Sequence, residues 1–86
     1  RIIGAPDLVV EDASPGTTGF DRRQKQDAYA LAGVPEYWIA LPASHTVELL
    51  VLENEAYHSL GIFEGRQTLP STVVPGFSVP VEQFFI

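Results

Sequence analysis

The residues most able to do chemistry in this sequence are one glutamate and the only lysine. Lys25 lies fourteen residues after Glu11, which follows a short apolar run. An ammonium group that points into a protein is costly unless it pairs with a carboxylate or takes part in a reaction. We therefore predict that Glu11 and Lys25 meet in the folded chain and form the centre of any functional site.

A carboxylate beside an ammonium group has two interpretations. In phosphodiester hydrolysis, carboxylates hold a divalent cation that activates water, and a positioned cation stabilises charge on the phosphoryl group. Glu11 could supply the first role in part and Lys25 the second. The alternative is a structural ion pair, either Glu11 with Lys25 or Asp21 with Lys25 at helical i, i+4 spacing. Residue types alone favour the structural pair.

The glutamate lies in a predicted strand. Residues 5–12 contain the apolar run Leu8–Val10, which is typical of a strand covered on both faces. Because strand side chains alternate, Asp7 and Glu11 would share a face, but about 13 Å would separate them at roughly 3.3 Å per residue. That distance is too large for one metal ion. Asp7 is therefore only a supporting candidate, and a second metal-binding acid must come from elsewhere.

The lysine lies on a predicted helix. A loop rich in Ser, Pro, Gly and Thr over residues 14–19 leads to Asp21, a good N-cap, and the Gly-Val-Pro sequence at 33–35 ends the helix. At 100° per residue, Lys25 falls on the apolar side of this helix together with Tyr29. The lysine should therefore point toward the sheet.

The rest of the chain predicts strands. Residues 36–41, 45–52 and 56–63 are three strands, the last two joined by a short hairpin loop. Residues 68–86 contain three prolines and can supply only short edge strands or extended cover. This order predicts an α+β (mixed α/β) fold in a single domain over residues 1–86, with one helix packed on a mostly antiparallel sheet.

The composition fits a folded domain. Hydrophobic residues make up 45% of the chain and charged residues 19%, and no apolar stretch approaches the roughly 18 residues of a membrane span. Cysteine is absent, which suits a reducing compartment, so we expect a cytoplasmic protein with no membrane partner. The net charge of −6 argues against a stand-alone module that coats nucleic acid, but it does not exclude a nuclease.

The order of these motifs resembles the Uma-two family of restriction-endonuclease-like proteins, which belongs to the PD-(D/E)XK nuclease superfamily. The resemblance covers about residues 4–42, and more loosely the later hairpin and the Pro-Gly-Phe sequence at 75–77. The matching motifs are Gly4–Glu11 (GAPDLVVE), Ser14-Pro15, Asp21, Lys25, Tyr29 and Gly33–Ile39 (GVPEYWI).

The resemblance implies a metal-dependent endonuclease that hydrolyses DNA with Mg²⁺ or Mn²⁺. Glu11 matches the metal-binding acid at the end of the strand, and Lys25 matches a lysine that has moved onto the following helix. Position 13 is alanine, so no Glu-x-Lys sequence is present. The superfamily's first aspartate, on an upstream strand, has no match here. We therefore expect these residues to be the C-terminal part of a larger nuclease-like domain and to be inactive alone.

Neighbouring polar residues could assist this site. Tyr29 and Asp21 would position Lys25, although the role of Asp21 as a helix cap already explains that residue. Arg22 and Arg23 are the only adjacent basic pair and could contact DNA phosphates, but a solvated helix face is the simpler interpretation.

Other aromatic and imidazole side chains have structural explanations. Tyr37 and Trp38 could stack on bases, but alternating core and surface packing in a strand is favoured. His45 and His58 fall in separate predicted strands without the spacing of metal ligands.

A different class of function also fits the sequence. A non-catalytic interaction or scaffold module could retain the nuclease fold, which would agree with the net charge of −6 and with the unmatched upstream acid. The apolar C-terminus and exposed strand edges make self-association reasonable. With the family resemblance, they lead us to expect a homodimer.

Overall fold

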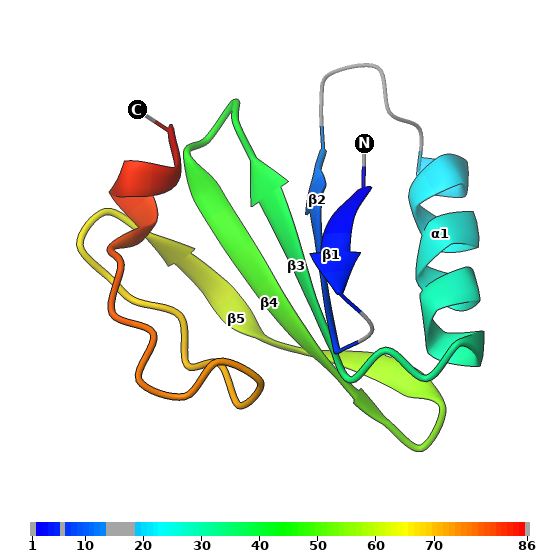
Figure 1. The fold of residues 1–86 in the computed structure, drawn as a ribbon. Helices are drawn as coiled ribbons and strands as arrows, with labels where there is room; N and C mark the ends of the chain where they lie inside the picture. Colours follow the sequence, from blue (N-terminus) through cyan, green and yellow to red (C-terminus); the bar gives the residue numbers. More distant parts are fainter. Residues whose placement is uncertain (1, 6, 14–18, 86) are drawn as a thin grey trace.

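The computed structural model describes residues 2–5, 7–13 and 19–85, with side chains over 7–13 and 23–85. A five-stranded sheet runs through these residues in chain order, with an α-helix and a short 3-10 helix beside it (Figure 1). The elements are β1 (Ile2–Ala5), β2 (Leu8–Asp12), α1 (Gly19–Leu31), β3 (Glu36–Leu41), β4 (Thr46–Glu53), β5 (Ala56–Glu64) and η1 (Val81–Phe85). Neither helix in these ranges has the length and apolar character needed to cross a bilayer.

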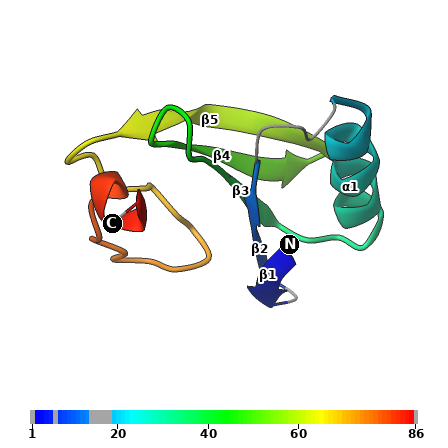
Figure 2. The same cartoon turned by 90° about the horizontal axis from the view of Figure 1, so that it is seen from above.

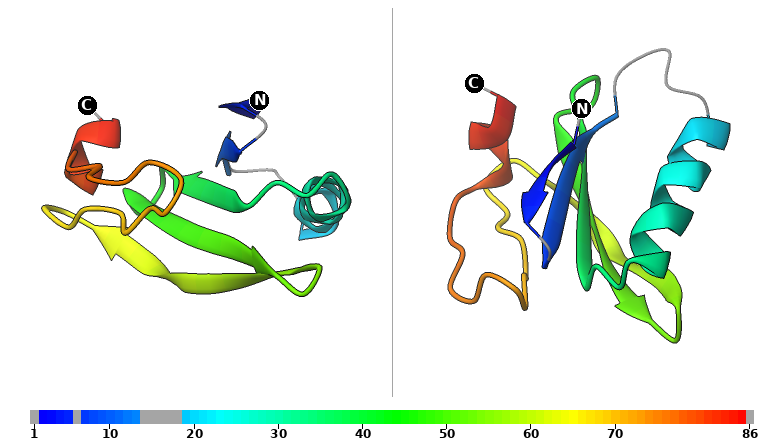
Figure 3. Two further views of the ribbon diagram at one scale, coloured as in Figure 1. Left: turned by 60° about the horizontal axis from the view of Figure 1, so that its bottom comes forward. Right: turned by 45° about the vertical axis from the view of Figure 1, so that its right-hand side comes forward.

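The sheet is mixed because one of its strand pairs is parallel. β2 and β3 run parallel, and α1 makes the crossover that such a pair requires. The pairs β1–β2, β3–β4 and β4–β5 are antiparallel. The predicted α+β fold, with one helix on a mostly antiparallel sheet, is therefore confirmed. Figure 3 shows the sheet twisting from the β1–β2 hairpin to the β4–β5 hairpin.

The N-terminal strand differs from its prediction. We expected one strand over residues 5–12, but Ala5 pairs with Leu8 in an antiparallel hairpin, and β2 begins only at Leu8. Asp7 lies in the turn and is exposed; aspartate favours turns because its side chain can hydrogen-bond nearby backbone. The expectation that Asp7 shares a strand face with Glu11 was therefore wrong.

Both faces of the central strand β3 are buried, and alternate residues pack into different cores. Figure 2 shows α1 and the C-terminal segment on opposite sides of the β2–β3 pair. The helix-side core contains Val9, Val34, Tyr37, Ile39 and Leu50. The tail-side core contains Trp38, Ala40, Val47, Leu49, Leu69 and Val81.

The C-terminal segment covers the tail-side core with loops and a 3-10 helix. Short edge strands were one of the two forms expected for residues 68–86, but none is present in the described part of that range. The backbone N–H of Val81 donates to the carbonyl of Gln67 at 2.9 Å, which ties the start of η1 to the loop after β5. Prolines in this segment cannot donate to a strand ladder, which explains the irregular path.

A buried glutamate fastens the C-terminal segment to the sheet. Glu36 is 0% exposed, and its two oxygens accept five hydrogen bonds, from the Trp38 indole, the Ser71 hydroxyl, both the backbone and hydroxyl of Thr72, and the backbone of Val73. Burial alone would raise the pKa of this carboxyl, but the hydrogen bonds outweigh burial and hold the pKa below its usual value. Glu36 is therefore a fully satisfied buried charge.

Candidate active site

The candidate site lies where the end of β2 faces α1. Glu11 pairs in register with Ile39 of the parallel strand β3. Because strand side chains alternate, Glu11 points to the same side as Val9, which belongs to the helix-side core. The Glu11 side chain is only 6% exposed. A carboxylate buried to this extent needs partners that donate hydrogen bonds.

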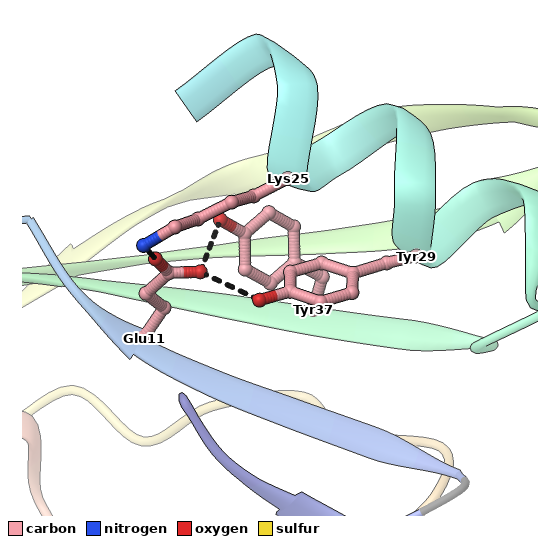
Figure 4. A network of polar contacts seen from close by, with 4 residues as sticks. All are labelled: Glu11, Lys25, Tyr29 and Tyr37. Atoms are coloured by element: carbon pink, nitrogen blue, oxygen red, sulfur yellow. Dashed lines mark hydrogen bonds and ion pairs between the residues drawn. The ribbon is translucent and has the colours of Figure 1, made fainter. Parts of the chain in front are cut away.

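The first partner is the lysine on α1. The Nζ atom of Lys25 lies 2.5 Å from Oε1 of Glu11, an ion pair that joins the helix to the sheet (Figure 4). The Lys25 side chain is 39% exposed, so its ammonium lies at the rim of the site. The helix therefore delivers Lys25 to Glu11, as its periodicity predicted.

Two tyrosine hydroxyls hold the other oxygen of Glu11. Tyr29 donates to Oε2 at 3.0 Å and Tyr37 donates to the same atom at 3.3 Å (Figure 4). Tyr29 follows Lys25 by one helical turn, so both side chains leave the same face of α1. Tyr37 comes from β3 and is 1% exposed. The two rings meet edge to face, with centroids 5.2 Å apart.

The surroundings keep Tyr29 and the neighbouring Tyr57 protonated. Burial, together with the hydrogen bond to Glu11 and its negative charge, raises the pKa of Tyr29 well above the usual value for a phenol. Burial also raises the pKa of Tyr57, whose ring lies 5.6 Å from that of Tyr37 and whose hydroxyl donates to the Val34 carbonyl at 2.7 Å. Tyr29 therefore acts as a hydrogen-bond donor across the neutral pH range.

The two oxygens of Glu11 differ in how many further donors or cations they can accept. An ionised carboxylate has roughly four lone-pair positions. Among the described side chains, Oε2 accepts from two hydroxyls, whereas Oε1 accepts only from Lys25. Mg²⁺ is commonly bound through one or two carboxylates and completed by water and substrate phosphates. These residues thus fit a divalent cation held by one oxygen of Glu11, although no three His, Cys, Asp or Glu side chains gather as a metal site within the described residues.

Four other predicted site residues, Asp7, Asp21, Arg22 and Arg23, have no described contact with Glu11 or Lys25. Asp21 and Arg22 lie in α1, but their side chains are outside the described residues, so the alternative pair of Asp21 with Lys25 is untested. The prediction of Asp21 as the N-cap was wrong, because the helix already begins at Gly19. Arg23 is exposed, as a solvated helix face would require. Asp7 is exposed in the turn before β2. Tyr29 bonds Glu11, whereas we had expected it to position Lys25.

The aromatic pair on β3 divides between the two faces of the sheet. Trp38 is buried on the tail side, where its ring lies 5.3 Å from that of Phe77. Because Tyr37 is buried as well, the expected alternation of core and surface packing was wrong: β3 is covered on both faces. Tyr37 faces Glu11, and its part in the site was missed. A tyrosine in a buried strand must find a partner for its hydroxyl, and that requirement was the available signal. His45 stacks on Phe85, and His58 is exposed on β5.

Comparisons with known proteins agree on the type of fold. Residues 1–82 match the family model "Uma2: Putative restriction endonuclease". The structure also resembles the crystal structure of "a putative nuclease belonging to DUF820" from Anabaena variabilis, with a TM-score of 0.69 and 19% sequence identity, over 96% of this chain and 45% of that one. Among curated proteins, none matches the sequence significantly. The chain spans less than half the length of the Anabaena variabilis protein, and its likeness to that protein shows a shared fold.

Proposed function

We propose a nuclease function from one premise, that this chain belongs to the Uma2 family. Within that family description, we propose a metal-dependent endonuclease of the PD-(D/E)XK type that hydrolyses DNA phosphodiester bonds. The observation that supports the proposal most strongly is the contact of Lys25 Nζ with Glu11 Oε1 at the end of β2. It places a carboxylate and an ammonium side by side at the rim of a sheet.

The role proposed for Glu11 is to hold a divalent cation. Within the described residues, Lys25 is the single donor to its Oε1 atom, whereas two hydroxyls donate to Oε2. A bound Mg²⁺ or Mn²⁺ ion would polarise the scissile phosphate and lower the pKa of a water molecule. A second carboxylate for that cation would have to come from outside the described residues.

The role proposed for Lys25 is to act on the water or on the phosphoryl group. An ammonium has three donors, and Glu11 takes one of them. With a 39% exposed side chain, Lys25 can direct the others toward a ligand at the rim. There it would orient the attacking water or stabilise the charge that develops on the phosphoryl oxygens.

The substrate and the assembly are proposals of the same kind. DNA as the substrate is supported by the description of the family as restriction endonucleases. Arg23 is an exposed cation on the same helix as Lys25 and could contact a DNA phosphate. The expected homodimer rests on the same resemblance and on the places of β1 and β5 at the two ends of the strand order.

The proposal can be tested by nicking of supercoiled plasmid by the full-length protein in Mg²⁺ or Mn²⁺. Glu11→Gln and Lys25→Met should each slow cleavage by about 100-fold or more, since each removes a group that acts on the transition state. Glu53→Gln and Arg66→Met are matched controls, because both residues are exposed and outside the site. Unchanged cleavage in both site variants would refute this assignment, and a wild type that neither nicks DNA nor binds Mn²⁺ would favour the scaffold function.

A further inference from the structure

The unequal surroundings of the two Glu11 oxygens have a consequence for cation binding. We infer that Tyr29 and Tyr37 reserve Oε2, so that a divalent cation can reach Glu11 only through Oε1 and must compete there with Lys25. This inference rests on the proposed function, because it assumes that Glu11 binds a divalent cation. It assigns Tyr29 and Tyr37 as positioning residues and Lys25 as an internal competitor for the cation.

The tyrosine pair fixes the carboxylate from two elements at once. Tyr29 reaches Oε2 from α1 at 3.0 Å and Tyr37 reaches it from β3 at 3.3 Å. The edge-to-face contact of their rings, at 5.2 Å, limits the movement of both hydroxyls. Rotation of the carboxylate would break two hydrogen bonds at a side chain that is 6% exposed. The orientation in which Oε1 faces Lys25 is therefore preferred.

The lysine occupies the oxygen that the tyrosines leave open. Lys25 Nζ lies 2.5 Å from Oε1, so the ammonium lies beside the oxygen to which a cation such as Mg²⁺ would bind at roughly 2.0–2.1 Å. A divalent cation on the same oxygen would be repelled by the ammonium, and at partly buried positions the solvent screens this repulsion incompletely. Removal of the ammonium should therefore strengthen cation binding.

The sign of this effect separates competition from a supporting role. If Lys25 only stabilised the structure of the site, its replacement would weaken Mn²⁺ binding or leave it unchanged. Competition predicts that Lys25→Met lowers the dissociation constant for Mn²⁺ by about tenfold. The gain in Mn²⁺ affinity should also depend on the hydroxyls of Tyr29 and Tyr37. Without them, a cation could bind Oε2, farther from Lys25, and removal of the ammonium would then matter less.

The test is a double-mutant cycle on the full-length protein, with Mn²⁺ binding followed by titration calorimetry and by electron paramagnetic resonance of the free ion. Lys25→Met and Lys25→Gln should both bind Mn²⁺ about tenfold more tightly than the wild type. In the Tyr29→Phe/Tyr37→Phe background, the gain from Lys25→Met should fall to about threefold or less. Arg66→Met removes an exposed charge elsewhere and should leave the affinity unchanged, and Glu11→Gln should abolish the gain.

Three results would overturn the inference. Weaker or equal Mn²⁺ binding by both Lys25 variants would exclude competition, and an equal gain in the two backgrounds would remove the role of the tyrosines. Absence of Mn²⁺ binding in every variant would also contradict it, because Lys25→Met is expected to bind. Plasmid cleavage by the wild type in Mg²⁺ would support the proposed nuclease function whichever of these three results is obtained.

Discussion

Replacing Glu36 by glutamine should destabilise the fold by about 2–4 kcal/mol at neutral pH. Oε1 of Glu36 accepts from the Trp38 indole at 2.7 Å and the Ser71 hydroxyl at 2.5 Å, and Oε2 accepts the three bonds from Thr72 and Val73. A glutamine amide has only one acceptor oxygen. At least one of these two groups of donors must therefore lose its acceptor.

The expected magnitude follows from the better of the two amide orientations. Keeping the amide oxygen toward Thr72 and Val73 turns the NH₂ group toward Trp38, whose indole N–H can only donate and is left unpaired. A buried donor without a partner costs about 1–3 kcal/mol, and the bonds that remain lose their charge assistance. Relief from burying a charge offsets part of this cost.

The penalty should also depend on pH. Because hydrogen bonds hold the folded pKa of Glu36 below its reference value of 4.5, its carboxylate contributes stability above that value. The contribution is lost as the pH falls through the folded pKa. Urea unfolding of wild type and Glu36→Gln should thus show a gap in midpoint at pH 7 that narrows below a pH of about 4.5. Hydrogen exchange should quicken at the Trp38 indole N–H, which loses its acceptor in the variant.

Glu53→Gln is the matched control for this experiment. Glu53 is exposed at the end of β4, so the same substitution there should change the free energy of unfolding by no more than about 0.5 kcal/mol. The reasoning is refuted if Glu36→Gln unfolds at the wild-type urea concentration at pH 7. It is also refuted if the gap between the two proteins stays constant into acid.

Two further predictions concern α1 and the turn that ends it. The surroundings of Tyr29 raise its pKa, so the ultraviolet titration curves of wild type and Tyr29→Phe should coincide up to a pH of about 10. If the wild type forms more phenolate than the variant below that pH, the prediction is wrong. Gly33 has φ of +76° with open space around its Cβ position, so Gly33→Ala should cost about 1 kcal/mol in urea unfolding through backbone strain alone. An unchanged or raised midpoint would exclude that strain.

The sequence was most informative where local patterns determine the structure. The helix signals around Lys25 and the apolar run before Glu11 predicted two elements whose parallel crossover brings these side chains together. The later strands β4 and β5 lie within one residue of their predicted ends, because their patterns are long and a hairpin loop separates them. β4 and β5 could be predicted because the pattern of residues close together in the sequence is enough to define them.

The features that were missed depend on partners far along the chain. Tyr37 meets Glu11 across 26 residues, and Glu36 meets Ser71 across 35 residues. Such contacts become visible only when the register of the sheet and the path of the C-terminal segment are known. β1 was also missed, because its pairing of Ala5 with Leu8 divides what reads as one continuous strand.

The measurement that tests the central claim most directly is the rate of plasmid cleavage by the full-length double variant Glu11→Gln/Lys25→Met. If the paired residues Glu11 and Lys25 act as one catalytic unit, the double variant should be no more than about threefold slower than the slower single variant. If the two losses multiply, Glu11 and Lys25 act independently and not as one unit; if the double variant cleaves at the wild-type rate, the pair is not the catalytic centre.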